Sequence, residues 1–141
     1  MLLPAEGSWW DWLKNFFNRK ARRRALYQKL DEQAANGDQN ARYKLLMLYY
    51  DEGPEYYPLV FKWTVAVANQ GEDCGVMIQA AEMYAAGHGV PPNDEKALLW
   101  FERSLSLHIM LGKDSPFSVE AANYIQEQIQ QLRDKLGKET P

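Results

Sequence analysis

The sequence predicts an all-α fold, an α/α superhelix of stacked antiparallel helix pairs with N-terminal and C-terminal capping helices. Three observations predict it. Apolar residues recur at the three- and four-residue spacing of helices, and no stretch alternates apolar and polar residues as a half-buried strand does. Glycine and proline divide the chain into segments of helical length. Two of these segments carry the same pattern at a fixed distance, which is typical of repeat folds.

The first predicted helix lies within residues 1–25 and starts near Ser8, a residue type that caps helix N-termini. Its apolar residues form one stripe, made of Trp9, Trp12, Leu13, Phe16 and Phe17. A basic block at residues 19–24 follows. This helix could cover the open end of the array, or it could contact a membrane surface or a partner. The contact residues would be Trp9, Trp12, Phe16, Phe17, Arg22 and Arg23.

Three further helices are predicted in the middle of the chain. One covers residues 20–36 and ends at Gly37, because glycine adopts the left-handed conformation that closes helices. The next two cover residues 39–51 and 59–70, with Gly53 and two prolines between them.

Three more helices are predicted after residue 72. They cover residues 73–86, a segment from Asn93 or Asp94 to His108, and a last helix after a linker. The last helix is expected to begin near Pro116, where the missing N–H does no harm. Its apolar seam is Ile125, Ile129, Leu132 and Leu136.

A repeat links the middle and the second half of the chain. A shift of 34 residues places Gly37 on Gly71, Tyr50 on Tyr84 and Gly53 on Gly87. Trp63 and Trp100 then take corresponding places, although the second loop is three residues longer. Paired helices that repeat with a period in the middle thirties predict an α-solenoid.

Residues 84–108, "YAAGHGVPPNDEKALLWFERSLSLH", resemble the Sel-1-like repeat, a relative of the tetratricopeptide repeat. The matching positions are Tyr84, Gly87, Gly89, Val90, Asp94, Lys96, Ala97, Trp100 and Phe101. Residues 48–75 form a weaker copy without the Gly-x-Gly-Val bend. Residues 26–41 resemble only the closing helix of a preceding unit.

This resemblance implies a half repeat at residues 26–37, repeats at 38–71 and 72–108, and a linker with a capping helix at 109–141. It also implies a superhelix that binds other proteins, often in bacterial signalling, secretion or envelope assembly. In such stacks the first helix of each pair lines the concave face. The implied protein-binding residues are Tyr43, Lys44, Leu48, Asp51, Ile78 and Glu82. Alternatively, the N-terminal or the last helix covers the apolar residues of 41–50.

Composition and charge restrict the class of protein. With 141 residues, 46% of them hydrophobic, the chain can bury one packed core. No apolar run approaches the roughly 18 residues of a membrane span, and no secretory signal is recognisable. Residues 1–30 carry a net charge of +5 and residues 31–141 a net charge of −8. We expect a cytoplasmic protein, with contact to the inner membrane as an alternative, and no nucleic-acid partner, because the body is acidic.

The loop at residues 87–92, "GHGVPP", is predicted to be a bend, not a ligand site. A dinucleotide fingerprint needs a preceding strand and a third glycine where Pro92 stands, and a phosphate loop needs Gly-Lys-Ser/Thr. His88 has no partner at metal-ligand spacing. Cys74, the single cysteine, is expected to be structural. We therefore expect no enzyme activity, metal or cofactor.

The sequence thus predicts a non-enzymatic protein-interaction module, a bacterial adaptor or an immunity protein. Its partner would be another protein, either a toxin or a secretion-system component. The alternative is a peripheral membrane scaffold that docks through its aromatic and basic N-terminal helix. The residues do not determine the oligomeric state.

Overall fold

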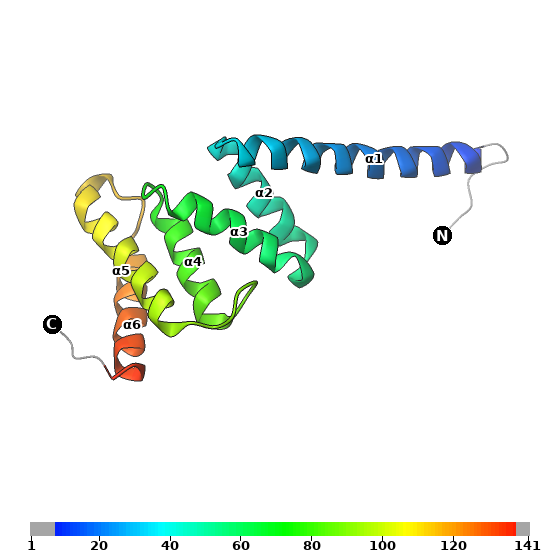
Figure 1. Ribbon diagram of the computed structural model, residues 1–141. Coiled ribbons are helices and arrows are strands. Elements are labelled where there is room, and N and C mark those ends of the chain that lie inside the picture. Colours follow the sequence, from blue (N-terminus) through cyan, green and yellow to red (C-terminus); the bar gives the residue numbers. More distant parts are fainter. Residues whose placement is uncertain (1–7, 138–141) are drawn as a thin grey trace. The chain divides into compact units, whose positions relative to one another are not determined.

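The computed structural model describes residues 8–137, and within that range every regular element is helical (Figure 1). The predicted all-α class is confirmed. The elements are α1 (Ser8–Ala35), α2 (Gln39–Glu52), η1 (Pro54–Tyr56), α3 (Tyr57–Ala68), α4 (Cys74–Ala86), α5 (Asp94–Leu111), η2 (Gly112–Asp114) and α6 (Val119–Lys135). The chain divides into an N-terminal unit, Met1–Ala41, and a C-terminal unit, Arg42–Pro141.

The N-terminal unit contains one continuous helix where the sequence predicted two. α1 runs for 28 residues, from Ser8 to Ala35, because no glycine or proline interrupts it. It ends in a Schellman motif at Gly37 (φ 97°), where the N–H of Gly37 bonds to Ala34 O and that of Asp38 to Gln33 O. The predicted stop at Gly37 is confirmed. The Ser8 side chain lies outside the described part of the chain.

The helices of the C-terminal unit pack on their neighbours in chain order: α3 on α4, α4 on α5, and α5 on α6 (Figure 1). Trp63 and Trp100, the two tryptophans that the predicted repeat aligns, are both buried. The largest fully buried side chains come from α2 to α6, and they include Leu45, Val60, Cys74, Phe101 and Ile125. One apolar core therefore extends along this unit.

The loop between α4 and α5 is a bend, as predicted. Gly87 (φ 73°) caps α4 in the left-handed conformation, and Asn93 caps α5 by accepting a bond from Lys96 N at 2.9 Å. Gly89 (φ 78°) lies so close to α3 that a Cβ there would be 2.2 Å from Tyr57 O. The second glycine is thus required by a close approach as well as by its positive φ.

The start of the last helix was predicted too early. α5 continues past His108 to Leu111, and α6 begins at Val119, with Ser118 accepting a bond from Ala121 N at 3.1 Å. Ser115 cannot cap α6, because its Oγ lies 2.6 Å from His108 Nδ1 and accepts a bond from Phe117 N at 3.2 Å. The predicted seam is correct: Ile125, Ile129 and Leu132 are buried and Leu136 is half-buried.

Candidate protein-binding groove

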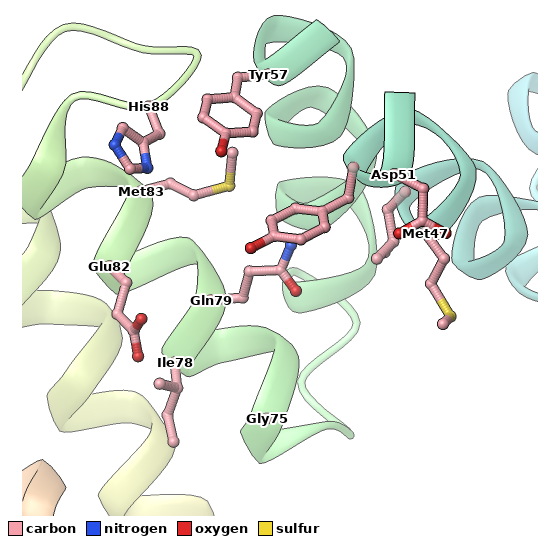
Figure 2. A pocket seen from close by; sticks show the side chains of 11 residues that line it. Met47, Asp51, Tyr57, Gly75, Ile78, Gln79, Glu82, Met83 and His88 are labelled. Carbon is pink, nitrogen blue, oxygen red and sulfur yellow. The ribbon is translucent and has the colours of Figure 1, made fainter. Parts of the chain in front are cut away.

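A groove with a volume of about 470 Å³ opens on the C-terminal unit, and we call it the central groove (Figure 2). α2 contributes Leu46, Met47, Tyr50 and Asp51. α4 contributes Gly75, Ile78, Gln79, Glu82 and Met83. Tyr57 at the start of α3 and His88 in the bend complete it. Residues three and four apart share one face of a helix, so α2 and α4 each present one face to the groove.

Aromatic rings form one wall of the central groove. The rings of Tyr50 and Tyr57 stack at 6.1 Å, and the rings of Tyr57 and His88 lie 5.0 Å apart. Figure 2 shows the His88 imidazole beside the Tyr57 ring. These three rings come from α2, α3 and the bend, so the close approach at Gly89 positions the wall. His88 is therefore part of this wall through its contact with Tyr57.

Large apolar side chains of the central groove are open to solvent. Met47 is 62% exposed and Tyr50 is 57% exposed, and both lie on α2. Single exposed apolar side chains are common on protein surfaces. A cluster of them in a concave surface is typical of a binding site. The flexible thioether of methionine also adapts to differently shaped ligands.

Two carboxylates give the central groove an acidic character. Asp51 lies on α2 and Glu82 on α4, and the lining residues, all within the described range, include no lysine or arginine. Glu82 Oε1 accepts a hydrogen bond from the Tyr124 hydroxyl of α6 at 3.4 Å. Burial and the Glu82 charge together raise the pKa of Tyr124, so its hydroxyl stays a donor. The groove thus offers apolar contact area with negative charge.

Three of the six predicted protein-binding residues line the central groove, namely Asp51, Ile78 and Glu82. The other three lie outside it, namely Tyr43, Lys44 and Leu48. The Tyr43 hydroxyl donates a hydrogen bond to Asp73 Oδ2, and Asp73 Oδ1 caps α4 by accepting a bond from Val76 N. Burial, and then the hydrogen bond to Asp73, raise the pKa of Tyr43. Tyr43 therefore joins α2 to the start of α4.

Sequence reasoning named three lining residues and left open which apolar side chains of residues 41–50 face a ligand, and only some of the other lining residues carried a signal. Met47 is four residues before Asp51 on α2, and Gln79 and Met83 neighbour Ile78 and Glu82 on α4. Helical periodicity could have found these. Tyr57 and His88 could not be found, because the approach of the bend to the start of α3 brings them together.

The predicted contact residues of α1 belong to the N-terminal unit. Trp9, Trp12, Phe17, Arg22 and Arg23 are exposed, and Phe16 is half-buried. The rings of Trp12 and Phe16 stack at 5.7 Å, and Lys20 Nζ lies 4.9 Å from the centre of the Phe16 ring. The aromatic stripe and the basic block are therefore in contact with each other along the helix.

Within residues 8–137, no three His, Cys, Asp or Glu side chains are grouped as a metal site would require. Burial and the Asp73 charge raise the pKa of the Cys74 thiol, which keeps it protonated. No helix of the described range has the length and apolarity needed to span a membrane.

The central groove and the α1 stripe are therefore the two candidate functional surfaces among the described residues. Comparison with protein-family models and with curated proteins finds no match to this chain.

Proposed function

We propose that this chain is a non-enzymatic protein-interaction module of the Sel-1-like repeat type, and that its partner binds in the central groove. In the cell it would serve as a bacterial adaptor or as an immunity protein that neutralises a toxin. The observation that carries the proposal is the exposed apolar surface of Met47 and Tyr50 inside a concave, acidic groove.

The repeat-like features of the C-terminal unit support the family part of the proposal. Gly53 and Gly87, which a shift of 34 residues aligns, both have positive φ. Trp63 and Trp100 are buried in α3 and α5, and α3, α4 and α5 each pack on the next helix along the chain. These features fit a short α/α superhelix in which α2 and α4 are the first helices of consecutive pairs, and such helices line the concave face.

The chemistry of the central groove indicates the kind of segment it binds. Asp51 and Glu82 favour lysine or arginine, and the stacked rings favour a further cation or an aromatic side chain. Met47, Ile78 and Met83 favour aliphatic side chains. The proposed ligand is therefore a positively charged amphipathic segment of another protein, bound as a helix between α2 and α4.

A displayed library of short random peptides tests this proposal with the full chain as bait. We expect enrichment of peptides that combine lysine or arginine with large apolar residues. Met47→Glu should abolish their binding, because it places a charge among the apolar side chains that line the groove. Ile109→Glu is the matched control, since Ile109 is 68% exposed and Met47 62%, but Ile109 lies outside the groove. Equal binding by wild type and Met47→Glu would contradict the proposal.

Co-expression distinguishes the two biological roles. An immunity protein should restore growth to cells that express a toxin encoded beside its gene, and Met47→Glu should lose this protection. An adaptor should bind its partner through the same groove without affecting growth. If Met47→Glu still protected the cells, the central groove would not be the surface that neutralises the toxin.

A further inference from the structure

The first half of α1 carries an apolar face that packs on no second helix within residues 8–41. At about 100° per residue, the six apolar side chains of residues 9–17 fall within about 160° of the helix circumference. Trp10 is 65% exposed and Phe17 is 61% exposed. In residues 8–41, the described part of the N-terminal unit, no second complete helix exists against which this face could pack. A patch of this kind indicates a docking surface.

The residue types of this face differ from those of a protein core. Five of the six apolar side chains in residues 9–17 are tryptophan or phenylalanine. Tryptophan combines a large apolar ring with one N–H donor, so it is enriched where an apolar phase meets water. A helix whose apolar face packs on another helix uses mainly leucine, isoleucine and valine. The composition of this face favours the interface of a lipid bilayer.

Asp11 lies within residues 9–17, and the charge that follows it along α1 is entirely positive up to residue 30. Residues 12–30 contain seven Lys/Arg and no Asp/Glu. Arg19, Arg22 and the Trp12 ring line a shallow hollow of about 400 Å³ on the α1 surface, together with two asparagines. Guanidinium groups bind phosphate through paired N–H donors. The hollow therefore places phosphate-binding groups directly beside a tryptophan of the apolar face.

We propose that residues 9–24 of α1 bind the surface of a bilayer containing anionic phospholipids. The helix lies parallel to the membrane, with Trp9, Trp12 and Phe16 among the acyl chains and the arginines at the level of the lipid phosphates. The apolar side chains supply contact with the acyl chains, Arg19 and Arg22 beside them supply contact with the phosphates, and charge complementarity selects anionic lipid. A single-stranded nucleic acid fits less well, because its sites interleave rings and cations along one groove. A second copy fits less well, because two identical cationic blocks repel each other.

Vesicle flotation of the full chain tests the proposal. We expect binding to vesicles of phosphatidylcholine mixed with phosphatidylglycerol, little binding to phosphatidylcholine alone, and release at high salt. Trp9→Ser combined with Trp12→Ser should abolish binding. Arg22→Gln combined with Arg24→Gln should weaken it about 25-fold, from about fivefold for each cation. Circular dichroism of each variant checks that the helix content is unchanged.

The first control matches the arginine variants in the charge removed. Lys44→Gln combined with Lys113→Gln removes the same charge from exposed positions outside α1 and should change vesicle binding less than twofold. Met47→Glu should leave it unchanged, since the central groove is a different surface. Equal loss in the Lys44/Lys113 control would overturn the proposal, because the net charge and not α1 would then drive binding.

Three further outcomes would also overturn it. One is no binding to the anionic vesicles. Another is self-association of the wild type in sedimentation equilibrium that is lost with Trp9→Ser/Trp12→Ser, without vesicle binding. The last is salt-sensitive binding to a single-stranded oligonucleotide without vesicle binding.

Discussion

α1 and α6 are both amphipathic helices, but they use their apolar faces differently. α6 carries an aliphatic seam at three- and four-residue spacing, and its members Ile125, Ile129 and Leu132 are buried as α6 packs on α5. α1 carries an aromatic stripe in which Trp9, Trp12 and Phe17 are exposed and Phe16 is half-buried. The difference teaches that an apolar stripe predicts a helix in both cases, whereas the residue types within it indicate whether a core or an interface covers it.

The largest expected effect is the difference between the α6 seam and the α1 stripe in what each contributes to the free energy of unfolding. Ile125→Ala should lower the free energy of unfolding by about 2–5 kcal/mol, because it leaves a cavity at a fully buried position. Trp12→Ala should cost less than about 0.5 kcal/mol, since its ring is exposed. Urea unfolding followed by circular dichroism measures both. A loss of several kcal/mol for Trp12→Ala would mean that α1 is held by its stripe as α6 is.

The next effect is the difference between Gly37, which ends α1, and Gly89, which lies in the bend after α4. Gly89→Ala should cost more than about 2 kcal/mol, because the new Cβ would meet the backbone of Tyr57 at a positive φ. Gly37→Ala should cost about 1 kcal/mol, since φ is positive there but nothing lies within 4 Å. Thermal unfolding of both variants gives the difference. Similar costs would show that the bend can move away from α3.

A smaller effect concerns the tie between α2 and α4. Tyr43→Phe should cost about 1 kcal/mol at neutral pH, because it removes the hydrogen bond to Asp73. The folded state raises the pKa of Tyr43 above the value of about 10 that it has when unfolded. The stability that this tyrosine contributes is therefore present below about pH 10 and is lost as the pH rises further.

Unfolding in urea between about pH 9 and pH 11 measures this dependence. We expect wild type to lose stability more steeply than Tyr43→Phe, and the two curves should converge as the pH rises. Parallel curves would show that folding does not change the pKa of the Tyr43 phenol.

The smallest effect tests whether charge or the seam holds α6. Lys135 Nζ lies 2.9 Å from Asp94 Oδ2 of α5, but its side chain is largely exposed. Lys135→Gln should cost less than about 0.5 kcal/mol, and even less at high salt. The measurement is urea unfolding at low and high salt, beside Ile125→Ala. A cost comparable to that of Ile125→Ala would assign the attachment of α6 to ion pairs.

Much of the fold could be predicted from local patterns. Helix positions followed from the spacing of apolar residues, and the stops at Gly37 and Gly87 followed from the conformational freedom of glycine. Two predicted helix boundaries were wrong for local reasons. The basic block offered no breaker between residues 8 and 35, so α1 is one helix, and the bond between Ser115 and His108 moved the start of α6. The first outcome depends on the absence of glycine and proline, and the second on a contact between two side chains. The spacing of apolar residues predicts neither.

The sequence by itself determined the helical class, the bend at residues 87–92, the aliphatic seam of α6 and the aromatic face of α1, because each depends on residues close together in the chain. Only the tertiary structure decided which side chains form the central groove. Tyr50, Tyr57 and His88 meet because the bend approaches α3 within the space that a glycine leaves. Tyr43 was assigned to the binding face by analogy, yet its hydroxyl bonds to Asp73. Contacts between distant segments are set by packing, and packing is a property of the whole unit, not of a local pattern.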